Sequence, residues 1–174
     1  MKRFICSTLA VATLAVAAQS GTAQARVFVS GGASIPVSDY KDDAKVGYMA
    51  QAGIGFPVGA PGFVVGIGGL YGSNSHDQDG DKTNLAGAAA YINYDFGTTA
   101  YVFAGPGYVK RSYKSDTFPD GSGSGLAATG GGGVNISVRG IDAFVEGMYL
   151  TGFGDIDGTD AFIASLGATF PVGG

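Results

Sequence analysis

The residues with the most obvious capacity to bind a metal lie in one polar segment, Asp77-Gln78-Asp79-Gly80-Asp81. Alternating aspartates beside a glycine resemble a calcium-binding loop, because Ca²⁺ prefers several oxygen ligands. An EF-hand needs its glycine at the sixth position and a bidentate glutamate at the twelfth, and this segment provides neither. We therefore interpret these carboxylates as solvated loop side chains and predict no metal site.

Nucleophilic catalysis and phosphate binding find equally little support. His76 is the only histidine, and a catalytic triad needs a nucleophile, a base and an orienting acid held together. Ser73, Ser75 and Asp77 lie near it in sequence, but such residues are ordinary in loops. The run Gly130–Gly133 has neither the Lys-Ser/Thr pair nor the helix of a phosphate-binding loop, so relief of crowding is its better interpretation. We predict no catalytic residues and no cofactor.

Glu146 is the one acidic residue placed well inside an apolar segment. In an extended chain it shares a face with Asp142, Phe144 and Met148. A buried carboxylate needs a partner or a proton. Arg111 is a candidate charged partner, and the neutral candidates are Gln51, Tyr91 and Thr129. Glu146 could belong to a structural polar network or to a gate or proton pathway.

The N-terminal segment has the layout of a secretory signal peptide. Two basic residues precede an apolar stretch from Phe4 to about Ala18, and a small-x-small site ends at Ala25. We predict a signal peptide at 1–25; the alternative, an N-terminal anchor, requires a longer apolar stretch. Cys6 is the only cysteine and lies in this segment, so the mature chain has neither disulfides nor thiolate metal sites.

The mature chain, 26–174, has the length of one domain. Its 8 basic and 14 acidic residues give a net charge of −6, which provides no electrostatic footprint for nucleic acid. Glycine is abundant, at 32 of 174 residues, but it is interleaved with apolar residues that can be buried. No apolar run of the mature chain is long enough for a transmembrane helix, so a membrane-spanning form would have to be a closed barrel.

Alternating apolar residues predict eight strands of roughly ten residues each. The last segment shows the pattern best: one face carries Phe162, Ala164, Leu166, Ala168 and Phe170. Its other face carries Ile163, Ser165, Gly167 and Thr169. The predicted strands span 26–35, 46–57, 62–73, 84–96, 100–113, 125–137, 141–152 and 160–170.

Two architectures fit such alternation. A soluble β-sandwich or a lipocalin-like carrier turns its apolar face inward, whereas a membrane barrel turns it toward lipid. A soluble exterior would carry many charged residues. Here the non-apolar faces carry mainly Gly, Ser, Thr, Asn and Gln, which suit a narrow barrel interior. The pattern therefore favours an all-β, eight-stranded antiparallel up-and-down transmembrane barrel.

Connection lengths support the same architecture. Short joints at 58–61, 97–99 and 138–140 alternate with longer polar ones at 36–45, 74–83, 114–124 and 153–159. Outer-membrane barrels have short periplasmic turns and longer external loops. With the N-terminus in the periplasm, the four longer connections lie outside.

Charged and aromatic residues also sort by position. Most acidic residues fall in or beside the long connections: Asp39, Asp42, Asp43, Asp77, Asp79, Asp81, Asp116, Asp120, Asp155, Asp157 and Asp160. A bilayer demands such exclusion of charge from the middle of each segment. The aromatic residues predict two interfacial belts. One belt contains Phe56, Phe63, Tyr94, Phe96 and Phe170, and the other contains Tyr48, Tyr71, Tyr108, Tyr149 and Phe162.

With these features the chain resembles the outer-membrane β-barrel domain family, the small OmpA-like, OmpX-like and opacity-like barrels. The resemblance covers roughly 26–170 and includes Val27–Pro36, Ala89–Phe96 and Tyr101–Tyr108 together with the last strand. It implies the outer membrane of a Gram-negative bacterium, contact with lipid and lipopolysaccharide, and insertion by the barrel-assembly machinery. Such barrels typically end in an aromatic residue, whereas here Phe170 is followed by Pro-Val-Gly-Gly.

The family resemblance implies no single shared activity. We expect a monomeric, non-enzymatic protein with a structural or surface-interaction role, binding any surface ligand through its four external loops. The main alternative is a narrow, porin-like passive pore for small solutes, although eight strands leave an interior that side chains can largely fill. An outer-membrane enzyme and a soluble carrier fit the residue pattern less well.

Overall fold

The computed structural model describes residues 24–172 except 79, 118 and 139–140. The predicted signal peptide therefore lies outside the described residues, apart from its last two positions. Within the described part of the chain, no helix is both long enough and apolar enough to cross a membrane.

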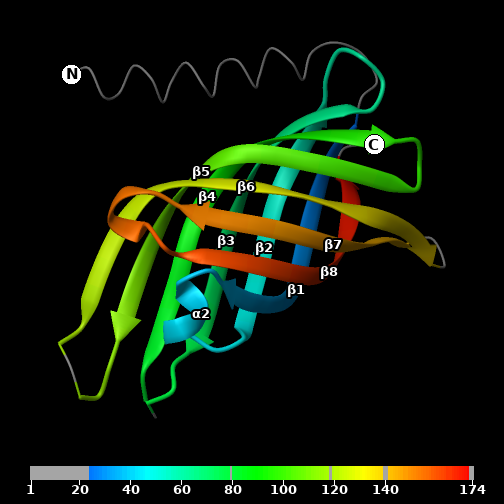
Figure 1. Ribbon diagram of the computed structural model, residues 1–174. Helices are drawn as coiled ribbons and strands as arrows, with labels where there is room; N and C mark the ends of the chain where they lie inside the picture. The colour runs from blue at the N-terminus through cyan, green and yellow to red at the C-terminus, as the bar shows by residue number, and fades with distance from the viewer. Residues whose placement is uncertain (1–23, 79, 118, 139–140, 173–174) are drawn as a thin grey trace, which may run out of the picture.

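Eight antiparallel strands form one closed barrel in which each strand pairs with its sequence neighbours (Figure 1). The barrel closes where β1 pairs with β8, with Val27 opposite Phe170 and Ala33 opposite Ala164. The strands are β1 (Ala25–Val37), β2 (Gly47–Pro57), β3 (Phe63–Ser75), β4 (Lys82–Phe96), β5 (Ala100–Lys114), β6 (Gly121–Val138), β7 (Ile141–Gly152) and β8 (Asp160–Val172).

The predicted strand number, order and topology are confirmed. The main difference is that β6 begins at Gly121 rather than near 125, because its first residues continue the ladder with β5. The β5–β6 connection is correspondingly shorter than predicted. The alternation of short and long connections is retained, with the longer ones after β1, β3, β5 and β7.

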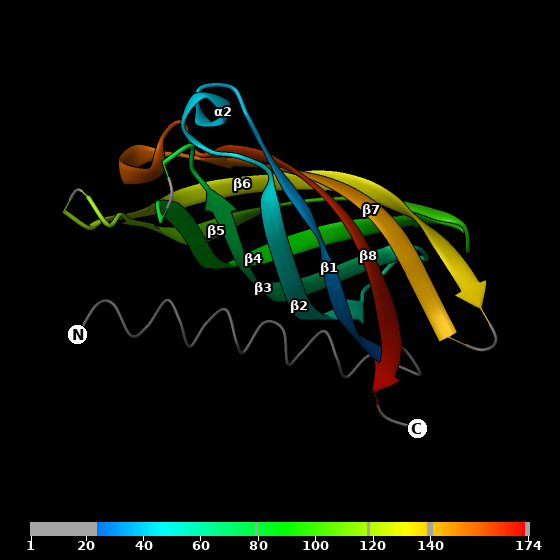
Figure 2. The ribbon, with the colours of Figure 1, turned by 90° about the horizontal axis from the view of Figure 1, so that it is seen from below.

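The two ends of the barrel differ in how their strands are joined. At one end the connections are tight, and Gly97 adopts the positive φ of 71° that the turn between β4 and β5 requires. At the other end, the connection after β1 contains a short helix, α2 (Tyr40–Asp43), and the connection after β7 contains the 3₁₀ turn η1 (Gly154–Ile156). The helix α2 and the 3₁₀ turn η1 lie at the same end of the barrel (Figure 2). We call this end, with the longer connections, the loop end, and we call the end with the tight connections the turn end.

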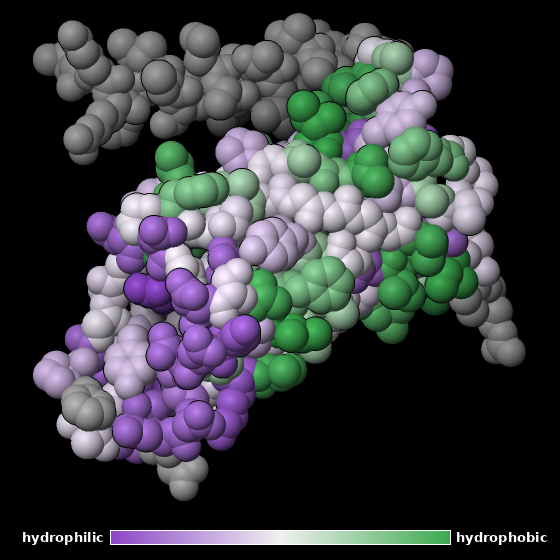
Figure 3. Space-filling model, in the orientation of Figure 1, coloured by the Kyte–Doolittle hydropathy of each residue, from purple (hydrophilic) through white to green (hydrophobic). Residues whose placement is uncertain are grey.

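The exterior of the barrel wall is apolar between the two ends. Large hydrophobic side chains such as Ile67, Val102 and Leu166 are exposed there. Hydrophilic residues gather at the loop end, with hydrophobic residues over the barrel wall (Figure 3). Of the ten aromatic residues predicted for the two belts, nine are exposed and only Phe56 is partly covered. The outward face of the last strand is also as predicted.

The inward face differs from the prediction of small and polar residues. Toward the loop end, large apolar side chains also point inward and are buried, among them Met49, Leu85, Leu150 and Ile163. The lumen therefore has two halves: an apolar core near the loop end, and a polar and aromatic cavity near the turn end.

Candidate functional site in the barrel lumen

The half of the lumen nearest the loop end is filled by an apolar plug. Met49, Leu85, Leu150 and Ile163 from four strands are almost completely buried in one cluster. Ile156 of η1 is also fully buried in it, so the last loop inserts a side chain into the barrel mouth. A continuous water path through this packed cluster would require its side chains to move.

Polar contacts join the connections after β1 and β3 at the loop end, next to the apolar plug. Asn74 is fully buried; its amide donates to the carbonyl oxygens of Ser34 (3.1 Å) and Lys45 (2.8 Å) and its own oxygen accepts from the Ser34 hydroxyl. Lys45 also forms an exposed ion pair with Asp77 at 2.9 Å. Tyr40 of α2 is buried, and burial raises its pKa to about 12, so its hydroxyl is neutral. The connections after β1 and after β3 are thereby held to each other and to the ends of these strands.

The acidic segment after β3 contributes a side-chain hydrogen bond at the loop end. The Tyr113 hydroxyl donates to the Asp81 carboxylate, and this hydrogen bond holds the pKa of Asp81 below its usual value. His76 Nε2 lies 2.8 Å from the Thr83 hydroxyl, and its imidazole contacts the Tyr113 ring edge to face. Among the described residues, no three His, Cys, Asp or Glu side chains are grouped to hold a metal, and Asp79 is not described.

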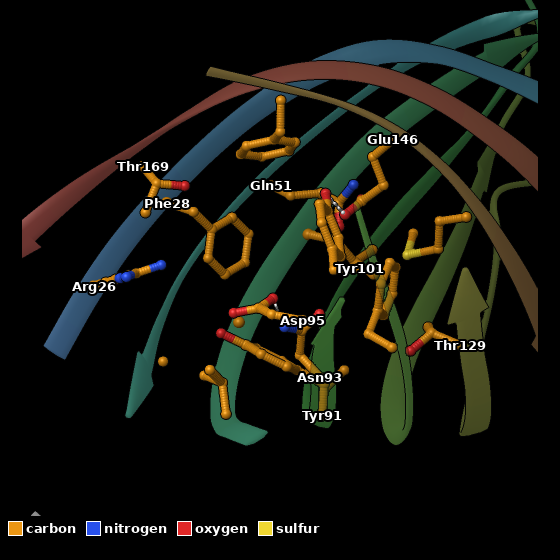
Figure 4. A pocket seen from close by; sticks show the side chains of 18 of the residues that line it. Arg26, Phe28, Gln51, Tyr91, Asn93, Asp95, Tyr101, Thr129, Glu146 and Thr169 are labelled. Atoms are coloured by element: carbon orange, nitrogen blue, oxygen red, sulfur yellow. Dashed lines mark hydrogen bonds between the residues drawn. The ribbon is translucent and has the colours of Figure 1, made fainter. Parts of the chain in front are cut away.

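A cavity of about 150 Å³ occupies the other half of the lumen (Figure 4). Arg26 and Asn135 line it and are exposed, so the cavity opens at the turn end. Glu146 and Gln51 lie deeper, and Leu70 and Met148 form its boundary with the apolar plug. The cavity is therefore a pocket entered from the turn end.

Five aromatic side chains form a collar around this pocket, and each is paired with a glycine. The opposing residues on adjacent strands are Phe28 and Gly53, Gly66 and Tyr91, Tyr101 and Gly133, Phe103 and Gly131, and Phe144 and Gly167. In every pair, a Cβ added to the glycine would lie 2.2–3.0 Å from the aromatic side chain. The rings therefore lean over neighbouring glycines along the barrel wall, and the lumen remains open between them.

The glycines Gly131 and Gly133 confirm that the run in β6 relieves crowding. A Cβ at Gly131 would also lie only 2.2 Å from the Gly147 carbonyl oxygen. The sequence pattern identified the crowding but not its cause, which is the presence of aromatic residues at the opposing positions of β5. This cross-strand register could be seen only once the strands were paired.

Glu146 points into the pocket, as predicted, but its partner was not foreseen. Tyr101 donates a 2.8 Å hydrogen bond to its carboxylate (Figure 4). Arg111 lies instead at the loop end, where it donates to the Thr159 hydroxyl at 2.8 Å. The candidate Arg111 is therefore not the partner of Glu146, because Arg111 and Tyr101 lie near opposite ends of β5. Asp142 is on the predicted face but is exposed beyond the pocket and accepts from Ser137.

All three neutral partners considered for Glu146, namely Gln51, Tyr91 and Thr129, line the same pocket. The Thr129 hydroxyl donates its hydrogen bond to the Gly105 carbonyl oxygen. The amide nitrogen of Gln51 is buried and makes no hydrogen bond among the described residues. At the mouth, Asn93 donates to the Asp95 carboxylate at 2.6 Å. The pocket therefore combines two carboxylates, one guanidinium and an unused amide donor.

The chain matches no protein-family model and no curated protein sequence. Solved structures do match. Neisserial surface protein A is similar with a TM-score of 0.58 and 12% identity, covering 87% of this chain and 100% of that one. The N-terminal β-barrel domain of Pseudomonas aeruginosa OprF matches with a TM-score of 0.55 and 16% identity, over 87% and 100% of the two chains.

A third similar structure is the attachment invasion locus protein Ail of Yersinia pestis, solved with the heparin analogue sucrose octasulfate. Its TM-score is 0.53 at 12% identity, over 86% of this chain and 100% of that one. At these identities the likeness concerns the fold. This chain has the fold of small outer-membrane β-barrels, and the predicted fold class is confirmed.

Proposed function

We propose that the protein is a monomeric, non-enzymatic outer-membrane barrel with a structural or surface-interaction role exercised through its loop end. The observation that carries this proposal is the apolar plug, because a lumen filled by Met49, Leu85 and Leu150 leaves the loops as the part of the protein that meets the exterior. The apolar belt faces lipid, and insertion would depend on the barrel-assembly machinery. The plug argues against the alternative of a narrow passive pore.

The charge of the loops indicates the kind of contact. Exposed carboxylates include those of Asp42, Asp43, Asp116 and Asp157. Ail was solved with a polyanionic heparin analogue. Acidic loops repel a polyanion, so we propose contacts with cationic surfaces or with lipopolysaccharide phosphates through bridging divalent ions.

A cellular comparison tests this function. A strain lacking the protein should attach less to cationic surfaces, and Asp42→Asn with Asp43→Asn should reproduce part of that loss because the variant removes two exposed loop charges. Asp142→Asn, which removes an exposed charge at the turn end, is the control and should behave as wild type. In liposomes, the wild-type protein should support no steady conductance. Steady conductance combined with wild-type attachment by the loop variant would show a pore instead.

A further inference from the structure

We propose that the pocket at the turn end binds a small organic cation, specifically a soluble alkylammonium ion that carries a hydroxyl group. The site is defined by the Glu146 carboxylate, the five-ring aromatic collar and the Gln51 amide. It lies on the opposite side of the plug from the loops, so the proposal is independent of any loop-mediated contact.

The chemistry of the pocket wall favours a cation. Rings of Phe28, Tyr91, Tyr101, Phe103 and Phe144 line the pocket, and the ring centroids of successive neighbours are 6.0–6.5 Å apart. Aromatic faces attract cations, and a group of rings around a carboxylate is a recognised way to bind an alkylammonium ion. A neutral apolar ligand would gain nothing from Glu146.

The charged side chains are spread unevenly along the pocket. Arg26 and Asp95 lie among the residues at the open end, where the solvent screens them, whereas Glu146 lies among the rings (Figure 4). Tyr101 is the one hydrogen-bond donor to Glu146 found among the described residues. A carboxylate with a single neutral donor keeps acceptor capacity for a cation.

The pocket wall also carries a polar atom without a partner among the described residues. The Gln51 amide nitrogen is buried on the pocket wall without a hydrogen-bond partner among the described residues. A buried donor of this kind is expected to find an acceptor. A hydroxyl oxygen on the ligand supplies one while the ammonium group faces Glu146. The cavity volume of about 150 Å³ suits a ligand of few heavy atoms.

Choline and its neutral carbon isostere, 3,3-dimethylbutan-1-ol, test the charge requirement. Calorimetric titration of the protein in a nonionic maltoside micelle at pH 8 should show choline binding at least about tenfold more tightly than the isostere, because only the cation uses Glu146 and the rings. Equal affinity for both compounds would show an apolar pocket without cation selectivity, and binding of neither would remove the site.

Variants assign the effect to the pocket. Glu146→Gln should reduce choline affinity about tenfold or more and leave the isostere unchanged, whereas Phe28→Leu should weaken choline binding about threefold to tenfold. Asp142→Asn, which removes a carboxylate from the same strand outside the pocket, is the matched control and should bind as wild type. If Glu146→Gln does not fold, Phe28→Leu alone decides; unchanged choline affinity in a folded Phe28→Leu or Glu146→Gln variant would overturn the proposal.

Discussion

Replacing Leu166 with arginine is expected to lower the free energy of unfolding in lipid bilayers by about 2–4 kcal/mol. Leu166 is 62% exposed on the outward face of β8, between Phe162 and Phe170 of the two aromatic belts. This position corresponds to the middle of the bilayer, where a cationic side chain loses its hydration. Urea unfolding of the protein refolded into vesicles measures the effect.

Val46 provides the matched control for this substitution. It is 61% exposed, nearly the same as Leu166, but it precedes β2 at the loop end. Val46→Arg should therefore change the free energy of unfolding by less than about 0.5 kcal/mol. In a soluble barrel both sites would face water, so equal and small effects at Leu166 and Val46 would contradict a lipid-facing exterior.

Gly32→Ala is expected to destabilise the barrel by at least about 2 kcal/mol, because it crowds the strands that close the sheet. A Cβ at Gly32 would lie 1.9 Å from the carbonyl oxygen of Ala164 and 2.6 Å from the Cα of Ser165. Both of these are backbone atoms, so the contact can be relieved only if β1 and β8 separate. The loss would be measured by urea unfolding and by the fraction of protein that migrates as the compact, heat-modifiable form.

The adjacent residue makes this prediction specific. Gly31 faces outward, and the nearest atom to an added Cβ is the Met49 carbonyl oxygen at 3.9 Å. Gly31→Ala should change stability by no more than about 0.5 kcal/mol, or raise it slightly by restricting the unfolded chain. Similar destabilisation by both substitutions would indicate a general intolerance of β1 rather than crowding at Gly32.

The sequence was sufficient for the architecture because the pattern is repeated in every strand. Leu166 and its outward neighbours alternate with inward residues, and the connections alternate in length, so strand number and orientation do not depend on any single boundary. The aromatic belts follow from the same logic. The β6 start was misplaced because Gly121–Ser124 is glycine- and serine-rich and lacks the apolar alternation that marks a strand.

The lumen was harder to predict, because it depends on which residues of different strands meet at one height. Met148 and Leu150 share an inward face with Glu146. The sequence shows that these apolar residues share a face, but it does not show at which level along the barrel axis they meet residues of the other strands. The collar pairs, such as Tyr101 with Gly133, depend on cross-strand register. Opposite charge suggested Arg111 as a partner of Glu146, whereas the hydrogen-bond donor that the folded barrel places beside Glu146 is Tyr101.

Separation of the membranes of a double-membraned bacterium expressing the protein tests the central claim most directly. The protein is expected to sediment with the outer membrane in a density gradient. Unheated protein is expected to migrate on gels as a compact form that heating converts to a slower one, because a closed barrel resists detergent. Recovery in the soluble periplasmic fraction without heat-modifiable migration would contradict the account of a lipid-facing, plugged outer-membrane barrel.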